Sequence, residues 1–562
     1  MTAQGINIPK NGKFGIEQLI YFTLFLFIVI VYVTGLFPET SVDSAKYASV
    51  SREMLSNGDL IHLKIHGDPY MQKPPFVFWL GAAFFKLFGI SIVVFKIPTL
   101  LFMLLGIYST YRLGKLMYNK NTGLLAALLY SANEALFLLT NDVHTDMIMA
   151  SNLIFGTWQL AEYLENRKVL NFILGFVGVG FAMISKGFLF VAVAGLSVAG
   201  YLLAKKRYRS LFSVKLLWGL LILAIIVYPA LKGLYDQFGL EGLKFYFWSN
   251  NIDRLRGVYS HNKHDYFFSF HTLIYLYLPW SVYAYAAFVR DAKRWYKNRF
   301  RIDDPKLAFA YFGIFPLFLT ICISSQQSPH YLLPVIPFIS IVTAGYLSDL
   351  ISDDKYYRQY KWMKISGYVI SFLAWPVALV MMLYFFPTSN VFIWGYLVVL
   401  LIIQIYCMFK LKTKLQQLII PPLISILIIG FVFNTVYMPS ALKYHGPIQA
   451  SYFYNKVAGE DEPLYTYEYG QYETYFYPEK VSKKVHDEKE LKELFSGDSS
   501  FWLITTEKGY DIIKPYRNRI EEEYVFPYKK LTNLSLKFMN PKTREKTLKN
   551  IYLLKIGPED KK

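Results

Sequence analysis

Two aspartates and two lysines interrupt or flank strongly apolar stretches of the chain. They are Asp43 in ETSVDSAKY, Lys73 in PYMQKPPF, Asp146 in NDVHTDM and Lys186 in ISKGF. A carboxylate can accept a proton from a hydroxyl or steady positive charge on a sugar carbon, and a lysine ammonium is a strong partner for phosphate. The two prolines after Lys73 restrict the backbone, so its ammonium is aimed. These residues point to a phosphate group handled next to lipid.

Each of these residues also has a purely structural interpretation. Asp43 and Asp146 stand where helix N-caps are expected. Lys73 could extend its ammonium from an apolar stem toward water, and Lys186 could mark a tight turn made with Gly187. However, an ionisable group costs roughly 2.5 to 3.5 kcal/mol at the centre of a membrane span, and less near its ends. Several such groups on one face therefore favour a functional site.

The composition predicts an integral membrane protein. Of 562 residues, 54% are hydrophobic and 18% charged, which lies outside the soluble range. About thirteen apolar stretches are long enough to cross a bilayer. They lie near 16–37, 91–111, 122–140, 147–163, 170–184, 187–204, 214–234, 268–289, 307–324, 331–350, 365–386, 391–409 and 416–437. The first is too long and aromatic for a cleaved signal peptide and is interpreted as an anchor.

Cys322 and Cys407 both fall inside predicted spans. They are interpreted as small hydrophobic residues, and two cysteines in these positions exclude a disulfide framework or a thiolate metal site.

The net charge of +19 follows the predicted topology. Alternate loops are all basic, which marks the cytoplasmic side. The residues are Lys10 and Lys13; Arg112, Lys115 and Lys120; Arg167 and Lys168; Lys205, Lys206, Arg207 and Arg209; Arg290, Lys293, Arg294, Lys297, Arg299 and Arg301; Lys355, Arg358 and Lys361; Lys410, Lys412 and Lys414. Membrane lipids, and no nucleic acid, are therefore the expected partners. The amino terminus is predicted inside and the carboxyl terminus outside.

The outer face receives the polar loops. They are 38–75, 141–146, 185–187, 249–270 and 324–334. The apolar stretch 75–89 is short for a crossing and is predicted to lie on the outer surface, which makes 38–90 one outer loop. The sequence thus predicts a membrane domain over 1–440 and, from its soluble pattern of short strands and an amphipathic helix, a small α/β domain over 441–562.

The block DSAKYASVSREMLSNGDLIHLKIHGDPYMQKPPFVFWL resembles the first outer loop of the aminoarabinose transferase (ArnT) family, which is related to protein O-mannosyltransferases. The stretches NDVHTDMIM, ISKGF and SPHYLLPVIP resemble further motifs of that family. The resemblance implies a GT-C type membrane glycosyltransferase with thirteen spans in the bacterial inner membrane. Its members move a hexosyl or pentosyl group from a polyprenyl phosphate, usually undecaprenyl phosphate, to an acceptor at the outer face, where lipid A, another lipid-linked glycan and a protein all stay open.

The resemblance also implies roles for individual residues. By motif, the acidic residues of the reaction centre would be Asp43 and Asp146, and the donor phosphate would be bound by Lys73, Lys46, Tyr331 and Lys186. This chain departs from the family at three positions: Lys46 replaces an arginine, Gln72 a glutamate and Gln327 a lysine.

The exchange at Gln72 bears on metal binding. Because an amide is a poorer metal ligand than a carboxylate, His264 is left as the only candidate ligand. No cofactor is expected to be required, and a divalent metal stays open.

The motifs favour a single displacement at the sugar's anomeric carbon, which inverts its configuration. Two other classes remain. A transporter or flippase of a lipid-linked sugar would place its charges near the bilayer midplane and often shows an internal repeat, whereas these motifs lie at one face. A scaffold subunit would need degenerate motifs, and those at Asp43, Lys73 and Asp146 are intact.

Overall fold

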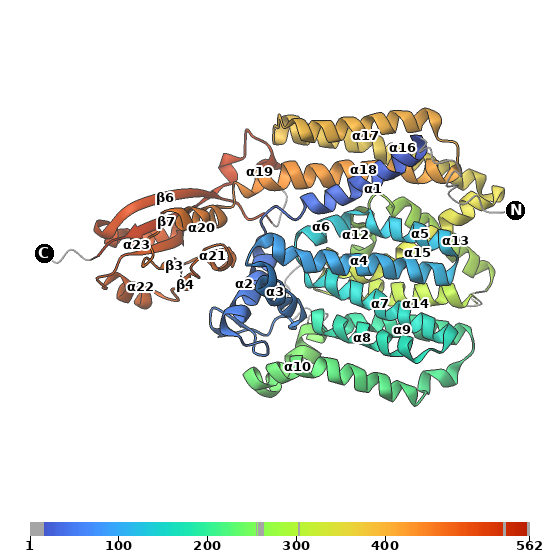
Figure 1. Ribbon diagram of the computed structural model, residues 1–562, viewed down its shortest axis with the longest axis horizontal. Coiled ribbons are helices and arrows are strands. Elements are labelled where there is room, and N and C mark those ends of the chain that lie inside the picture. Colours follow the sequence, from blue (N-terminus) through green and yellow to red (C-terminus); the bar gives the residue numbers. More distant parts are fainter. Residues whose placement is uncertain are drawn as a thin grey trace.

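The computed structural model describes residues 16–253, 256, 264–299, 301, 304–531 and 535–558. A bundle of long, roughly parallel helices carries a smaller region with a β-sheet at one end (Figure 1). The predicted fold class, a helical membrane protein followed by a carboxyl-terminal α/β region, is confirmed.

Nine helical segments among the described residues are long and apolar enough to cross a membrane. Their main helices are α1 (Ile16–Thr34), α4 (Ile92–Met117), α8 (Val169–Lys186), α10 (Lys215–Lys244), α14 (Pro305–Ile323), α15 (Ile336–Ser352), α16 (Tyr357–Val380), α17 (Val391–Lys410) and α18 (Lys414–Val432). The pair α5 (Lys120–Ser131) and α6 (Glu134–Asn141), bent by 52°, would make a tenth span. The exact number of thirteen stays a prediction.

Four further helices complete the bundle: α7 (Thr145–Asn166), α9 (Ala192–Ala204), α12 (Phe268–Leu276) and α13 (Ser281–Lys297). Helix α7 packs against both α4 and α8 and is almost entirely buried. It therefore lies at the centre of the bundle, and its first turn sets the position of Asp146.

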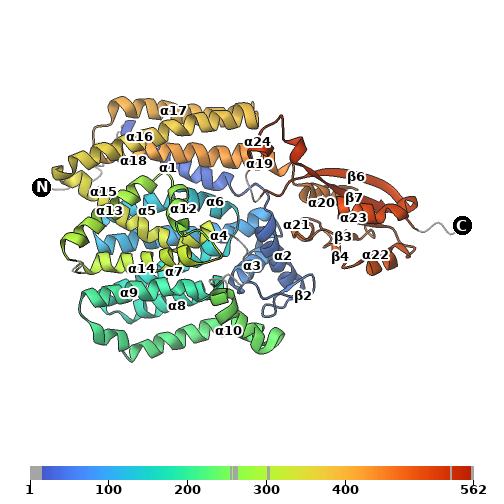
Figure 2. The same cartoon turned by 180° about the vertical axis from the view of Figure 1, so that it is seen from behind.

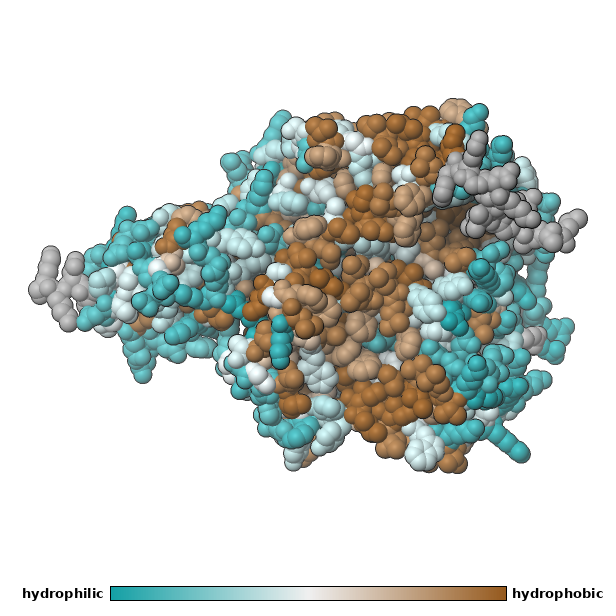
Figure 3. All heavy atoms as spheres, in the orientation of Figure 1, coloured by the Kyte–Doolittle hydropathy of each residue, from teal (hydrophilic) through white to brown (hydrophobic). Residues whose placement is uncertain are grey.

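Figure 3 shows a wide apolar band on the visible face of the bundle, between two hydrophilic ends. Large apolar side chains are exposed on the spanning helices, for example Phe25 on α1, Leu217 on α10 and Phe392 on α17. A continuous apolar surface of this extent is typical of contact with lipid. The protein is therefore a multi-pass membrane protein.

The first polar loop folds into two short helices, α2 (Val42–Asn57) and α3 (Phe76–Phe88), and a hairpin of β1 (Lys64–Ile65) and β2 (Asp68–Pro69). Pro75 is the N-cap of α3, with φ −79°. At 13 residues, α3 is too short to cross a bilayer core. Figure 2 shows α2 and α3 between the bundle and the carboxyl-terminal region.

The carboxyl-terminal region begins with α19 (Met438–Leu442) and α20 (Gly446–Val457) and contains a five-stranded mixed sheet of order β4-β3-β5-β7-β6. The strands are β3 (Leu464–Tyr467), β4 (Lys483–Lys484), β5 (Phe501–Thr506), β6 (Ile520–Tyr528) and β7 (Lys549–Ile556). Helices α21 (Glu473–Phe476), α22 (Glu488–Phe495), α23 (Glu507–Ile513) and α24 (Leu536–Met539) connect or flank them. Of these helices, α21 lies on the side toward the helical bundle and contacts α2.

Candidate functional site

Asp43 and Lys46 form an ion pair on α2. They are three residues apart and therefore lie on one helix face; Lys46 Nζ is 2.7 Å from Asp43 Oδ1. The same ammonium donates to Gln72 Oε1 at 3.4 Å and lies 5.3 Å from the ring centroid of Tyr472. Asp43 is in the first turn of α2, and the N-cap residue is Ser41. The structural interpretation of Asp43 as the cap is therefore wrong.

The charges around Asp43 keep it ionised. Burial alone would raise the pKa of Asp43, but the ammonium of Lys46 outweighs burial, with help from His144 and Lys73, so that the pKa lies below its ordinary value of 3.8. An ionised carboxylate at neutral pH can accept a proton. The same interactions show that the start of α2, the start of α7 and the segment before α3 converge.

Asp146 and Lys186 form a second, buried ion pair. Asp146 in the first turn of α7 is 1% exposed, and Lys186, the last residue of α8, is 6% exposed. Oδ1 of Asp146 accepts a hydrogen bond from the Lys186 ammonium. The N-cap of α7 is His144, so the capping interpretation of Asp146 is also wrong. Lys186 does precede Gly187, the C-cap of α8 with φ 139°, but the charge of Lys186 is used in the pair.

A pocket lies beside this pair. Its walls include the side chains of Lys73, Lys186 and Tyr331, together with apolar residues such as Phe190 and Ile321. The Lys186 ammonium is 4.3 Å from the ring centroid of Tyr331. Cationic groups surrounded by an apolar wall suit a phosphate that is attached to a hydrocarbon chain. The pocket thus contains three of the four residues that the resemblance places at the donor phosphate. The fourth, Lys46, forms its ion pair with Asp43 instead.

His264, the metal ligand that the sequence left as a candidate, lies in a loop that Gln327 holds. Its ring packs against Tyr266, and the next residue, Asp265, is bound through its backbone N–H and carbonyl by the side chain of Gln327 at 3.2 and 2.7 Å. Gln327 therefore anchors a loop in this chain. Gln72 contacts Lys46, as described above.

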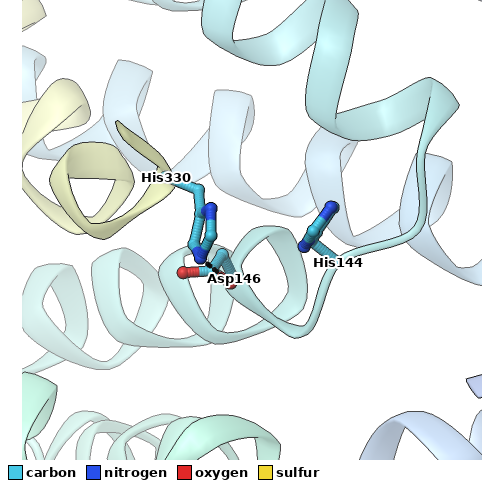
Figure 4. A group of neighbouring side chains, drawn as sticks. All are labelled: His144, Asp146 and His330. Carbon is cyan, nitrogen blue, oxygen red and sulfur yellow. Dashed lines mark ion pairs between the residues drawn. The ribbon is translucent and has the colours of Figure 1, made fainter. Parts of the chain in front are cut away.

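Among the described residues, one group of three has the spacing of metal ligands, and it does not include His264. The group is His144, Asp146 and His330 (Figure 4). Neither histidine was singled out from the sequence. Their only local signals are the spacing of His144 two residues before Asp146 and the position of His330 next to Tyr331.

Glu473 of the carboxyl-terminal region is a further residue that the sequence did not reveal. It is fully buried, and its Oε1 accepts the backbone N–H of Val42 at 2.7 Å while Oε2 accepts the hydroxyl of Tyr469 at 2.8 Å. Val42 has φ 52°, a left-handed conformation that is strained for a β-branched residue. The bond from Glu473 therefore holds a strained residue directly before Asp43.

Arg52 adds a second connection between α2 and the carboxyl-terminal region. Its guanidinium donates to the carbonyl oxygens of Phe476 at 2.9 Å and Pro478 at 2.7 Å. Together the two connections fix both the start and the middle of α2 against the segment 469–479.

Replacing Glu473 with Ala is expected to speed amide hydrogen exchange across residues 40–46. The substitution leaves the Val42 N–H without its acceptor, which destabilises the local structure. Hydrogen exchange followed by mass spectrometry measures this. Glu493→Ala, at an exposed carboxylate of the same region, is the matched control and should leave 40–46 unchanged. Equal exchange in Glu473→Ala and wild type would contradict the role of this bond.

The fold is that of ArnT. The chain superimposes on ArnT from Cupriavidus metallidurans bound to undecaprenyl phosphate with a TM-score of 0.71 and 17% identity, covering 96% of this chain and 98% of that one. The same ArnT in the apo state gives a TM-score of 0.70. The likeness extends over the bundle and the carboxyl-terminal region alike.

Sequence comparison indicates the same relatives. Residues 72–231 match the dolichyl-phosphate-mannose-protein mannosyltransferase family. The undecaprenyl phosphate-alpha-4-amino-4-deoxy-L-arabinose arabinosyl transferase of Yersinia enterocolitica is 24% identical over 314 residues, 55% of each chain. A second transferase of this name, from Proteus mirabilis, is 24% identical over 363 residues, 62% of each chain. The chain thus spans less than two thirds of these relatives. The resemblance to ArnT predicted from the motifs is confirmed.

Proposed function

We propose that this protein is a membrane glycosyltransferase that moves a sugar from a polyprenyl phosphate donor to an acceptor at the outer face of the bacterial inner membrane. The observation that carries the proposal is the pocket in which Lys73, Lys186 and Tyr331 meet an apolar wall. The names of the relatives, which include undecaprenyl phosphate, and the solved structure of ArnT with that lipid support the choice of donor. The acceptor is lipid A, another lipid-linked glycan or a protein.

The proposed reaction is a single displacement. The acceptor oxygen forms a bond to the anomeric carbon while the bond from that carbon to the phosphate oxygen breaks, and the polyprenyl phosphate leaves with the electron pair. Lys73, with Lys186 and Tyr331 of the same pocket, stabilises the negative charge that builds on the phosphate. A hydroxyl acceptor gives its proton to Asp43. Attack from the opposite face inverts the configuration of the sugar.

Asp146 acts through Lys186 in this proposal. Because both side chains are buried and paired, the ammonium of Lys186 is held at the pocket wall in one position. A positioned charge costs no reorganisation when the phosphate leaves. Asp146 therefore serves the reaction centre by fixing a cation.

In the proposed orientation, the amino terminus lies in the cytoplasm. Residues 1–440 form a membrane domain, and residues 441–562 form a domain in the periplasm. In support, α1 begins at the end of the bundle opposite the sheet region (Figure 2), and the basic loops alternate as cytoplasmic loops do. Lys10 and Lys13, which contribute to this pattern, lie outside the described residues.

The direct test follows a radiolabelled sugar. Purified protein in vesicles receives labelled undecaprenyl-phosphate sugars and total envelope acceptors, and the label is expected to move from the carrier to either a lipid or a protein fraction. The alternative, a flippase, predicts that the label crosses the vesicle membrane while it stays on the carrier. That result would contradict the proposal that this protein transfers the sugar to an acceptor.

A further inference from the structure

The group of His144, Asp146 and His330 has the arrangement of a partly open metal site. His144 and Asp146 come from the start of α7, and His330 comes from the short helix Pro329–Val335 before α15. One ligand atom from each residue lies within 4.8 Å of the other two, and His330 Nε2 is 4.0 Å from Asp146 Oδ2. Figure 4 shows a nitrogen of each ring directed toward the carboxylate. Two distant segments therefore meet at one point.

Each histidine also has a partner on its other nitrogen. Nε2 of His144 is 3.0 Å from Asp142 Oδ2, and Nδ1 of His330 is 3.0 Å from Ser328 Oγ. Histidines that bind metal nearly always donate their second N–H to a carboxylate, a carbonyl or another polar group, which fixes the tautomer and the ring orientation. Both rings therefore have the outer contact that a metal ligand needs.

The carboxylate of Asp146 is shared between two neighbours. Oδ1 accepts the hydrogen bond from Lys186, whereas Oδ2 faces His330. The carboxylates of Asp142 and Asp43 also act electrostatically on the ring of His144. Three carboxylates thus act on the ring of His144, while the ammonium groups of Lys186 and Lys73 act on that of His330.

We propose that His144, Asp146 and His330 bind a divalent transition metal ion of the zinc type. Zinc bonds to nitrogen and oxygen of about 2.0 to 2.2 Å place tetrahedral ligand atoms about 3.3 Å apart, so binding draws these three atoms together by roughly 1 Å. Two imidazoles with one carboxylate favour zinc over magnesium or calcium. Three protein ligands leave a fourth position open for water or a substrate oxygen.

The proposed site lies next to the pocket. Asp146 bonds to Lys186 and His330 precedes Tyr331, and both Lys186 and Tyr331 line that pocket. A metal bound there would supply Lewis-acid charge stabilisation beside the donor phosphate. This role rests on the proposed function, whereas metal binding itself does not.

Metal content of the purified full chain tests the inference. After treatment with a chelator and equilibration with Zn²⁺, plasma mass spectrometry is expected to find about one zinc per chain. His330→Ala and His144→Ala are expected to lose it. Asp142→Asn, which removes an outer partner, should weaken binding by about 10- to 100-fold. His264→Ala and His62→Ala are the controls and should retain the metal.

Folding and metal binding are separated by two further measurements. Gel filtration and thermal unfolding verify that each variant is folded. If His330→Ala does not fold, His330→Gln provides a milder change at the same position. Cobalt absorption spectra of the wild type report nitrogen ligation directly and should change in the His330 variant. Wild-type protein without stoichiometric zinc, or zinc lost in His264→Ala and kept in His330→Ala, would overturn the inference. Zinc binding without sugar transfer would support this inference and contradict the proposed function.

Discussion

Asp43→Asn is expected to lower sugar transfer to a hydroxyl acceptor by about 10²- to 10⁴-fold, the usual contribution of a positioned general base. The amide has nearly the same size as the carboxylate but cannot take up the proton. The ion pair with Lys46 is also lost, although the lysine still reaches Gln72. Initial rates with a labelled polyprenyl-phosphate sugar measure the effect, and donor binding is measured separately.

A matched control comes from the same outer loop. Asp59 accepts backbone N–H groups of Ile61 and His62 near the surface, away from the pocket residues, and Asp59→Asn should leave the transfer rate close to that of the wild type. Donor binding is expected to change little in Asp43→Asn, because the pocket cations remain. Transfer at the wild-type rate in Asp43→Asn would remove this residue from the reaction centre.

The second large effect is expected on stability. Replacing Lys186 with Met, or Asp146 with Asn, removes one member of a pair in which both residues are buried. An unpaired buried charge costs about 3 to 5 kcal/mol, so either single variant should unfold far more easily than the wild type. The free energy of unfolding in detergent, measured with denaturant, detects this loss.

A double-mutant cycle separates the pair from its surroundings. The variant with both Lys186→Met and Asp146→Asn should recover much of the loss, because no buried charge is left uncompensated. The exposed pair of Lys489 and Glu493 on α22 provides the comparison, and breaking it should change stability little. Strictly additive losses at Asp146 and Lys186 would contradict direct coupling between them.

The sequence predicted the elements of the site better than their contacts. Apolar length reveals a membrane helix, and the spacing of Asp43 and Lys46 is sufficient to place both on one helical face. The pairing of Asp146 with Lys186 was not predicted, since the residues are 40 positions apart and their contact depends on how α7 packs on α8.

The structural alternative, in which Asp43 and Asp146 are N-caps, places each helix start two residues too late. The preference of aspartate for N-caps favoured Asp43 and Asp146, but Ser41 and His144 occupy those positions. Capping preference alone does not choose between neighbouring polar residues, because tertiary contacts decide where the first turn begins. Both aspartates therefore lie in the first helical turn, where the helix dipole also favours a carboxylate.

The bond from Glu473 to Val42 joins residues separated by 431 positions. During synthesis α2 emerges from the ribosome long before α21 exists, so the start of α2 is completed only after the chain has been made well past residue 473. A chain that stops before that point contains the helical bundle. It lacks the hydrogen bond from the Val42 N–H to Glu473, and with it the contact that holds the residue before Asp43. Under the proposed function, the residue that takes up the acceptor's proton is therefore held in place only after residue 473 has been made.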